Sequence, residues 1–379
     1  MTATLLKNCR FYAADNSLKS ADILMNEYEI LEVKKHIAPK SHAVINVENN
    51  LVVPAFIDLQ VNGGGTSFFN NATTPESIME ISKAHENLGT AYILPTLISS
   101  PIEKIIVAIS AVKKAMLVHP GILGMHLEGP FLNKEKHGGH NPQIIRQPSD
   151  EELALIIQHG KGVIKMITIA PEIFTSEQIQ QLTAAGFVVS VGHSNATYEQ
   201  AKAFFINGVS CATHLYNAMS PFTGKEPGLV GAVFSSDAYA GIIVDGVHAH
   251  FQSVKMASDL LKEKLFLVSD ASFTGAPAQE KIYFEGVEIS FSNGQYYTPS
   301  GKLAGSCISM LDAVKNCVEH AGISPFLAIK MATEIPAEIL GVNNKMGKIE
   351  EGFSSKLLVL NEKWELLQSV NSRQHQFSL

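Results

Sequence analysis

Short apolar segments of strand length alternate with amphipathic segments along most of the chain after residue 52. Apolar positions at helical spacing fill most of the intervals between these segments. The strand candidates are Val52–Leu59, Ala91–Pro95, Gly121–Glu128, Val163–Ile169, Phe187–Val191, Cys211–His214, Gly241–Val244 and Phe266–Ser269. The helix candidates include Pro75–Leu88, Ile102–Val118, Asp150–Gln158 and Tyr198–Phe205. Strands that alternate with helices pair in parallel, and eight of them suffice to close a barrel. The pattern therefore predicts an α/β fold of the (β/α)8, TIM-like type.

The two ends of the chain show a different pattern, in which short strand candidates are separated by turn residues. Before residue 52 they are Ala21–Leu24, Glu29–Val33 and Ala43–Val47, and the segment from Gly347 to Leu360 is predicted as strand, turn and strand. We therefore expect a small β-sandwich domain made from residues 1–52 and 345–379, with a barrel of residues 53–344 inserted in it. After the eighth strand, Ile282–Thr298 is predicted to add short strands around an Asn293-Gly294 turn.

Composition and charge exclude several classes of protein. The 379 residues are 46% hydrophobic and 17% charged, which is too apolar for a disordered chain. The net charge of −7 argues against a nucleic-acid partner, which needs a basic face. The N-terminus lacks the features of a secretory signal, and the longest apolar runs are far shorter than the roughly 20 residues of a membrane span. We expect a soluble, cytoplasmic protein with no membrane partner, whose four Cys are reduced.

Polar side chains and glycines gather where the strand candidates end. The segments at these ends are Ile57–Gly65, His126–Phe131, Lys136–Asn141, Val191–Ser194, Thr213–Ala218, Asp245–His248 and Ser269–Ala271. In a parallel barrel the carboxyl ends of all strands form one rim, and active sites are built there. We therefore expect these segments to contribute to a single site.

Glu128, His193 and His214 are the candidate metal ligands on this rim. One carboxylate and two imidazoles leave coordination positions open for water, which is typical of a catalytic rather than a structural site. A bound divalent ion lowers the pKa of its water towards about 7. Asp270 could take the proton of that water and pass it to a leaving group. The alternative is that each residue only caps or hydrogen-bonds the rim, which explains one histidine more readily than the whole set.

The remaining histidines have plainer interpretations. His126 shares the strand face of Glu128, so it is expected either to support a ligand or to pack in the core. Surface or helix-cap positions are expected for His85, His119 and His159. In the rim loops, spacing alone does not rank His137, His140, His248 and His250.

The loop after the sixth strand indicates an anionic ligand. Asn217 and Ala218 lead into Thr223–Gly228, where backbone N–H groups together with Lys225 could hold a phosphate. Turn chemistry alone also explains the Gly and Pro residues of this loop, and without other information it is the favoured interpretation. Both interpretations stay open at this point.

Eight segments carry a resemblance to a known family. They are His126–Pro130, Gly139–Pro142, Gly192–Ser194, Thr213–Met219, Gly224–Leu229, Asp245–His248, Ser269–Asp270 and Leu303–Ser306. In this order, and over nearly the whole chain, the sequence resembles the N-acetylglucosamine-6-phosphate deacetylases of the amidohydrolase superfamily. The resemblance implies metal-dependent hydrolysis of N-acetyl-D-glucosamine 6-phosphate to glucosamine 6-phosphate and acetate, in amino-sugar catabolism. It also implies a homodimer of barrels, each with a small β domain made from both chain ends.

The resemblance assigns roles position by position. Glu128, His193 and His214 match the metal ligands, and Asp270 matches the catalytic acid and base. His140 matches a residue that contacts the substrate and polarises the acetyl carbonyl. The matching sugar-phosphate contacts are Asn217, Ala218, Lys225 and His248. The further substrate-binding positions are Gly139, Asp245, Leu303, Ala304 and Gly305.

Two departures from the family pattern bear on the chemistry. Many amidohydrolases carry His-x-His at the end of the first strand and bind two metals, whereas this chain has Gln60-Val61-Asn62. Amides are poor substitutes for imidazole, so we predict one divalent ion per subunit, either Zn or one of Fe, Ni and Mn. A weak second ion near Gln60 and Asn62 stays open. Lys225 stands where the family usually has Arg, so bidentate phosphate recognition is lost.

Three other functions remain as alternatives. An N-acetylgalactosamine-6-phosphate deacetylase would act on a sugar that differs only at C4. A cyclic-amide hydrolase of the same superfamily usually keeps the first-strand histidines, which this chain lacks. A non-catalytic sugar-phosphate binding protein would not need the set of Glu128, His193, His214 and Asp270.

Overall fold

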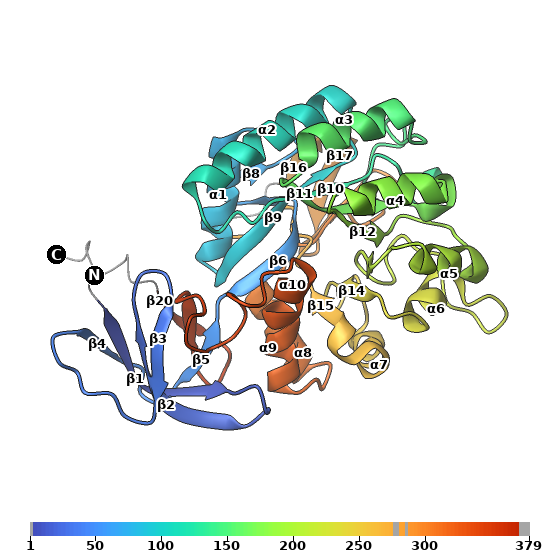
Figure 1. The fold of residues 1–379 in the computed structure, drawn as a ribbon. Helices are drawn as coiled ribbons and strands as arrows, with labels where there is room; N and C mark the ends of the chain where they lie inside the picture. Colours follow the sequence, from blue (N-terminus) through green and yellow to red (C-terminus); the bar gives the residue numbers. More distant parts are fainter. Residues whose placement is uncertain (1–2, 276–279, 285–286, 371–379) are drawn as a thin grey trace.

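A computed structural model describes residues 3–275, 280–284 and 287–370, and its centre is a barrel of eight parallel strands (Figure 1). In order around the barrel they are β6 (Phe56–Val61), β9 (Thr90–Ile98), β10 (Met125–Glu128), β11 (Ile164–Ile169), β12 (Val188–Val191), β13 (Cys211–Ala212), β14 (Tyr239–Ile242) and β15 (Leu265–Leu267). A parallel bridge between Val61 and Ala271 joins the last strand to the first. The predicted TIM-like barrel is confirmed, and all eight strand candidates contribute to it.

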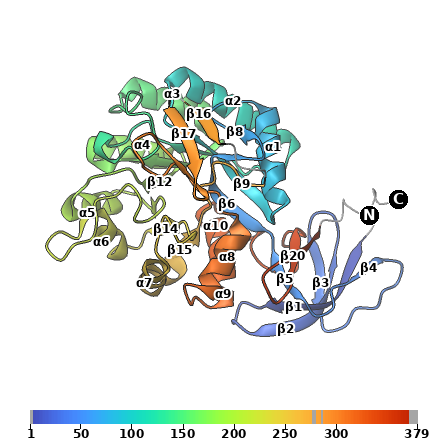
Figure 2. The same cartoon turned by 180° about the vertical axis from the view of Figure 1, so that it is seen from behind.

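Helices surround the barrel on its outer side (Figure 2). They are α1 (Pro75–Glu86), α2 (Ile102–Val118), α3 (Asp150–Gly160), α4 (Ser176–Ala184), α5 (Tyr198–Ile206), α6 (Gly228–Phe234), α7 (Phe251–Leu261), α8 (Met310–Glu319), α9 (Pro325–Ala332) and α10 (Glu334–Ile339). Short 3-10 helices occupy Lys134–Lys136, Pro171–Ile173 and Lys262–Lys264. Among the described residues, no helix combines the length and apolarity needed to cross a membrane.

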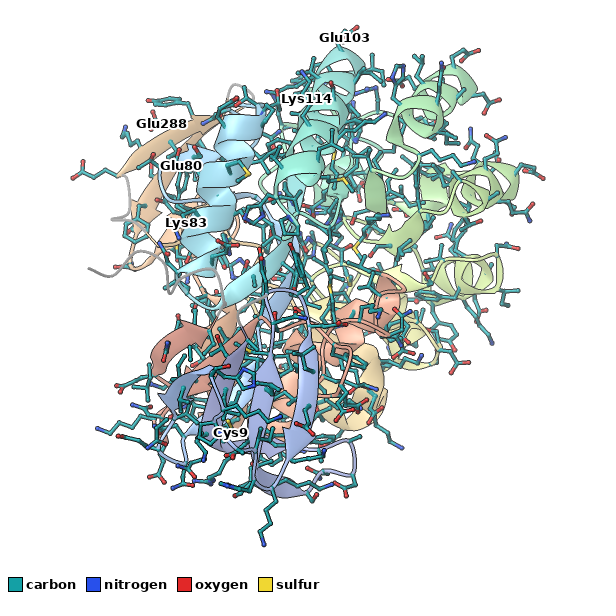
Figure 3. All side chains as sticks on the ribbon, turned by 60° about the vertical axis from the view of Figure 1, so that its left-hand side comes forward. Cys9, Glu80, Lys83, Glu103, Lys114 and Glu288 are labelled. Carbon is teal, nitrogen blue, oxygen red and sulfur yellow. The ribbon has the colours of Figure 1, made fainter. Side chains whose placement is uncertain are left out.

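Helix starts and helix faces follow the sequence pattern. Side-chain oxygens of Thr74 and Ser149 accept hydrogen bonds from the first turns of α1 and α3, which satisfies backbone N–H groups that have no partner within the helix. Charged side chains such as Lys83 on α1 and Lys114 on α2 point away from the barrel, as Figure 3 shows. The opposite faces pack their apolar residues against the strands.

Strands from both chain ends form a second sheet beside the barrel. They are β1 (Thr4–Tyr12), β2 (Leu18–Met25), β3 (Ile30–Lys34), β4 (Ala43–Asn46), β5 (Leu51–Pro54), β19 (Leu357–Leu360) and β20 (Leu366–Val370). This single seven-stranded sheet encloses an apolar cluster of its own that includes Cys9. The expected union of the two chain ends is confirmed, although residues 1–2 and 371–379 of the predicted domain lie outside the described residues.

The structure corrects three details of the predicted strands. The candidate Val52–Leu59 is divided at Ala55, so that β5 pairs with β19 in the end sheet while β6 opens the barrel. The C-terminal hairpin comprises β19 and β20 rather than the segment from Gly347 to Leu360, because the uninterrupted apolar run begins only at Leu357. The sequence pattern also missed β1, which pairs with β2, β4 and β5.

A three-stranded antiparallel sheet follows the eighth barrel strand, as predicted. It consists of β16 (Lys281–Phe284), β17 (Val287–Ser292) and β18 (Gln295–Tyr297); residues 285–286 of the predicted segment lie outside the described residues. Asn293 and Gly294 make its turn with φ of 50° and 81°, as a tight hairpin requires. Apolar residues of this sheet pack against Phe68, in the short strand pair β7 (Gly63–Gly64) and β8 (Ser67–Phe68), and against Ile98 on β9.

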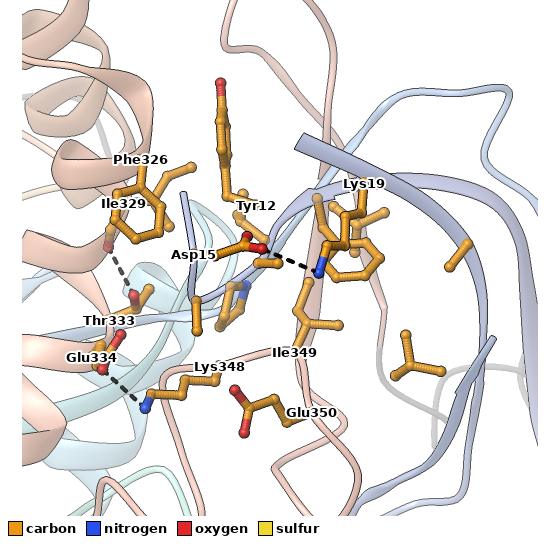
Figure 4. A pocket seen from close by; sticks show the side chains of 18 of the residues that line it. Tyr12, Asp15, Lys19, Phe326, Ile329, Thr333, Glu334, Lys348, Ile349 and Glu350 are labelled. Carbon is orange, nitrogen blue, oxygen red and sulfur yellow. Dashed lines mark hydrogen bonds and ion pairs between the residues drawn. The ribbon is translucent and has the colours of Figure 1, made fainter. Parts of the chain in front are cut away.

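A cavity of about 560 Å³ lies where the end sheet meets α9 and α10 (Figure 4). Its walls carry several lysines whose charges are balanced by carboxylates. Lys19 pairs with Asp15 at 3.6 Å, and Lys348 pairs with Glu334 at 3.0 Å. Lys19 and Lys348 are therefore each neutralised by a carboxylate of the same chain.

Candidate active site

A second cavity, of about 540 Å³, opens at the carboxyl ends of the barrel strands. It brings together the four residues predicted to carry the chemistry, namely Glu128, His193, His214 and Asp270. They follow or end β10, β12, β13 and β15, and all four are nearly buried. Residues up to 142 positions apart in the chain thus share one site, because a parallel barrel aligns the ends of its strands (Glu128 and Asp270 span this range).

The backbone is strained at three of these four positions. His193, His214 and Asp270 have φ of 49°, 33° and 49°, in the left-handed region that residues other than glycine rarely adopt. Such conformations cost free energy and persist where the surrounding structure holds them. Each of the three residues lies in the turn shortly after a barrel strand, where its side chain can project into the cavity.

Three ligand atoms converge on one point. The Nε2 atoms of His193 and His214 lie 3.1 and 3.0 Å from Oε1 of Glu128, and the two nitrogens lie 3.1 Å apart. Burial alone would raise the pKa of Glu128, but the two imidazoles beside it hold that pKa well below its usual range. Glu128 is therefore a carboxylate at neutral pH.

The tautomer of His193 tests whether this cluster fits a metal ion. Its Nδ1 lies 2.7 Å from the carbonyl oxygen of Lys136, which only accepts hydrogen bonds, so Nδ1 carries the proton. In the neutral ring Nε2 is then a lone pair facing the carboxylate of Glu128. Nε2 of His193 and Oε1 of Glu128 are thus two acceptors that lie 3.1 Å apart, an arrangement that a cation bound to both would stabilise. A ligating histidine is usually supported by a hydrogen bond from its other N–H to a backbone carbonyl, as seen here. The set of one carboxylate and two imidazoles fits one divalent ion.

The two amides at the end of β6 act as hydrogen-bond donors. Gln60 Nε2 donates to Oε2 of Glu128 at 3.1 Å, and Asn62 Nδ2 donates to Oδ1 of Asp270 at 2.5 Å. Each amide therefore holds a carboxylate in place. At Glu128 the amide binds Oε2, whereas the two histidine nitrogens face Oε1. This arrangement supports the expected single metal ion.

Asp270 has the properties of a proton carrier at neutral pH. Burial, followed by the negative charge of Glu128, raises its pKa to about 7. A carboxyl group whose pKa lies near the working pH can both accept and return a proton. Perturbed carboxyl groups of this kind cluster at functional sites.

His140 is a neutral donor beside the ligand cluster. Its Nδ1 accepts the backbone N–H of Ser99 at 3.3 Å and lies 2.7 Å from the Ser99 hydroxyl, so the proton is on Nε2. Burial is the main cause that holds the pKa of His140 well below its usual range. Nε2 lies 4.0 Å from Oε1 of Glu128, and one atom each of His140, Glu128 and His193 fall within 4.8 Å of one another. A carbonyl oxygen bound at this cluster would meet an N–H.

The cavity wall contains most of the residues matched to substrate contacts. Gly139, Asn217, Ala218, His248, Leu303, Ala304 and Gly305 all line it. At Gly139 a Cβ would lie 3.2 Å from that of Ala304, so a larger residue would crowd this wall. Phe68, Ile98, Lys136, Ser272 and Lys302, which the sequence did not single out as contacts, also line the cavity.

Two of the matched residues do not line the cavity in this chain. Asp245 accepts a hydrogen bond from Nδ1 of His248 at 2.7 Å, so it holds His248 while the latter faces the cavity. Lys225 lies on an exposed loop before α6. Lys225 is therefore not part of the wall of this cavity.

Two histidines given plain interpretations are buried. Nδ1 of His126 donates to the carbonyl of Leu59 and Nε2 accepts from the Thr168 hydroxyl, so His126 packs within the barrel. His85 was expected at the surface or at a cap, but it is only 1% exposed, and its Nε2 donates to the carbonyl of Gly63 at 2.9 Å. The helical pattern alone did not show that α1 turns this side chain towards the loop after β6.

Comparison with known proteins finds the same architecture in deacetylases. The model of the amidohydrolase family matches residues 51–376. N-acetylglucosamine-6-phosphate deacetylase from Haemophilus influenzae is 37% identical over 374 residues, covering 96% of this chain and 97% of that protein. N-acetylgalactosamine-6-phosphate deacetylase from a Shewanella species is 38% identical over 335 residues, covering 87% and 84%. The crystal structure of the N-acetylglucosamine-6-phosphate deacetylase from Pasteurella multocida aligns with a TM-score of 0.94 at 33% identity over 98% of both chains.

Proposed function

The chain belongs to the amidohydrolase family, and on that premise we propose that it hydrolyses N-acetyl-D-glucosamine 6-phosphate to glucosamine 6-phosphate and acetate. The observation that carries this proposal is the convergence of Glu128, His193 and His214 on one point beside Asp270. The relatives named for this reaction cover nearly the whole chain, so the proposal extends to the entire molecule.

Glu128, His193 and His214 would hold one divalent ion, which when bound activates water and the acetamide carbonyl. Zn, Fe, Ni and Mn all suit this donor set. Nε2–H of His140 donates to the carbonyl oxygen and stabilises the negative charge that develops there. Asp270 accepts a proton from the attacking water and returns it to the sugar nitrogen as the C–N bond breaks. The carbonyl carbon thus forms a C–O bond with the water oxygen and is released as acetate. The broken C–N bond releases the amine, which carries the proton.

We propose further that the residues lining the cavity bind the sugar and its phosphate. Gly139, Asn217, Ala218, His248, Leu303, Ala304 and Gly305 supply these contacts, and Asp245 acts through His248. Lys225 would take part only from the second subunit of a homodimer. A cytoplasmic homodimer with a β domain of residues 1–52 and 345–379 around a barrel of residues 53–344 completes the proposal.

Acetate release from N-acetylglucosamine 6-phosphate tests the proposed reaction. We expect steady release by metal-replete protein and loss of release after dialysis against a chelator, with recovery on adding back one divalent ion per chain. N-acetylglucosamine without phosphate should react far more slowly. Binding of the sugar phosphate without acetate release would instead favour a non-catalytic binding protein.

The Shewanella relative gives a second candidate substrate. Its identity to this chain is 38%, against 37% for the Haemophilus deacetylase, so similarity alone does not separate the two sugars. The C4 epimers differ in the direction of one hydroxyl. Comparing kcat/KM on the two 6-phosphates separates them: a higher value for the glucosamine epimer supports the first proposal, and a higher value for the galactosamine epimer replaces it.

A further inference from the structure

A buried carboxylate lies close to the candidate active site without lining its cavity. Asp58 is on β6, the first barrel strand, and its side chain is fully buried. It accepts a hydrogen bond from the N–H of Gln60 at 3.1 Å. It also accepts from Ser269, whose N–H lies 3.2 and 3.3 Å from the two carboxylate oxygens and whose hydroxyl donates to Oδ2. Asp58 therefore binds both the end of β6 and the residue that precedes Asp270.

The burial of this carboxylate is unfavourable. Burial raises the pKa of Asp58 to about 7, in spite of the hydrogen bonds that it accepts from Ser269 and Gln60. A neutral side chain at this position of β6 would avoid the free energy of burying a charge. Because carboxyl groups with such perturbed pKa values gather at functional sites, the hydrogen bonds of Asp58 are expected to serve the site.

One arm of Asp58 reaches the strained backbone of Asp270. The hydroxyl of Ser269, which donates to Asp58, also accepts the N–H of Ala271 at 3.2 Å. Between these two residues, the N–H of Asp270 donates to the carbonyl oxygen of Gln60 at 2.9 Å. Asp270 has φ of 49°, a conformation that persists only where the surrounding structure holds it. Asp58 fixes Ser269, so it holds Asp270 in this conformation from both sides.

The other arm of Asp58 reaches the metal-ligand cluster. The backbone N–H of Gln60 is bound to Asp58, while Nε2 of the same residue donates to Oε2 of Glu128 at 3.1 Å. Fixing the backbone of Gln60 limits where its side chain can place that donor. A single residue thus separates Asp58 from Glu128, and a single residue separates it from Asp270.

We propose that Asp58 is a positioning residue that acts through Ser269 on the proton carrier Asp270. Through Gln60 it acts in the same way on Glu128. Because both arms start from one buried group on β6, the carboxyl group that moves the proton and the carboxylate that binds the metal keep a fixed relative position. This inference rests on the proposed function, which gives Asp270 the task of moving a proton.

Two substitutions separate the arms. Ser269→Ala removes only the hydroxyl that donates to Asp58, whereas Asp58→Asn removes acceptor oxygens from both arms. Ser269→Thr is the conservative variant, because it retains the hydroxyl. Thr333→Val is the matched control: it removes the hydrogen bond of another buried hydroxyl, which donates to the carbonyl of Ile329 at 2.8 Å beside the cavity of Figure 4. Thermal unfolding of each variant establishes that it is folded.

Acetate release by the full-length, metal-loaded protein tests the arm that reaches Asp270. We expect Ser269→Ala to lower kcat roughly 10- to 100-fold, with little change in KM or in metal content. Ser269→Thr should restore most of kcat, and Thr333→Val should keep the wild-type value. Lower thermal stability in Ser269→Ala with an unchanged kcat would show a purely structural hydroxyl and would overturn the proposal.

A double-mutant cycle shows whether Ser269 acts through Asp270. Adding Ser269→Ala to Asp270→Asn should lower kcat little further, because the group that Ser269 positions is already lost. A further loss of roughly 10- to 100-fold in the Asp270→Asn background would mean that Ser269 acts on another group, and this outcome contradicts the proposal.

Titration with Zn²⁺ tests the arm that reaches Glu128 and does not depend on the reaction. Asp58→Asn should weaken Zn²⁺ binding, by up to roughly 10- to 100-fold, whereas Ser269→Ala should bind as wild type does. Wild-type affinity in Asp58→Asn overturns this part of the proposal whatever the reaction. A wild-type protein that binds Zn²⁺ but releases no acetate contradicts the proposed function and with it the role of Asp58 at Asp270, and the titration still decides its role at Glu128.

Discussion

At the residue scale, two amides support the two carboxylates of the site. Gln60 and Asn62 donate to Glu128 and Asp270 respectively, so each amide serves one carboxylate with a different task. Groups that orient a metal ligand or a catalytic residue are commonly worth 10- to 100-fold in affinity or activity. The two amides should therefore be distinguishable by which property they control.

Replacing each amide with alanine tests this division. Gln60→Ala should weaken metal binding roughly 10- to 100-fold, because Glu128 loses the donor that holds its second oxygen. Asn62→Ala should retain the metal and lower kcat by a comparable factor, because Asp270 loses its donor. Metal titration and steady-state kinetics on both variants provide the measurement. The same pattern of loss in both variants would contradict separate roles.

His85 gives a prediction about stability and pH. Burial lowers its pKa from 6.5 to about 4, while the unfolded chain keeps the ordinary value. Below pH 6.5 the unfolded state therefore binds more protons, so the free energy of unfolding falls as the pH drops from 6.5 to 4. A difference of this size corresponds to about 3 kcal/mol at most.

Denaturant unfolding of wild type and His85→Gln between pH 4 and 7 measures this contribution. Glutamine can donate to the carbonyl of Gly63 but does not titrate, so the variant should show a weaker loss of stability on acidification. His159→Gln, at an exposed position on α3, is the control and should follow the wild-type curve. Parallel curves for wild type and His85→Gln would show that His85 does not contribute.

At the element scale, β19 connects the end sheet to the barrel. Leu358 on β19 is 2% exposed, pairs with Val53 on β5, and belongs to the same apolar cluster as Phe56 on β6. On β20, Leu367 is 52% exposed. The two leucines of this hairpin thus differ in burial but not in chemistry.

Truncating each leucine tests how firmly β19 supports the barrel. Leu358→Ala should lower the free energy of unfolding by roughly 2 to 5 kcal/mol, because a buried side chain leaves a cavity. Leu367→Ala should change it by less than about 0.5 kcal/mol. Chemical denaturation of both variants provides the comparison. Equal effects would mean that β19 packs loosely against the barrel.

The sequence pattern predicts the barrel strands better than it predicts the strand pairing of the end sheet. Alternating apolar and amphipathic segments indicated all eight barrel strands, because covered parallel strands are short and continuously apolar. β1 escaped prediction because its polar residues, including Lys7, Asn8 and Arg10, interrupt the apolar pattern. Its role depends on pairing with three other strands, which no local pattern records.

At the scale of the whole molecule, the barrel turns scattered residues into one site. Glu128, His193, His214 and Asp270 could be predicted to meet because each ends or follows a strand, and strand ends meet on one rim. Ser99, which sets the tautomer of His140, could not be predicted in the same way. Its role depends on a hydrogen bond between separate loops, and the residue does not stand out by type or spacing.

The proposed mechanism depends on Asp270 as the proton carrier, in a reaction that also needs a metal held by Glu128, His193 and His214. The most direct measurement is acetate release from N-acetylglucosamine 6-phosphate by wild type and Asp270→Asn, with the metal content of each determined in parallel. We predict equal metal content and a loss of turnover of roughly 10²- to 10⁴-fold in Asp270→Asn, since asparagine cannot accept the proton. Full turnover by Asp270→Asn with its metal in place would contradict the account.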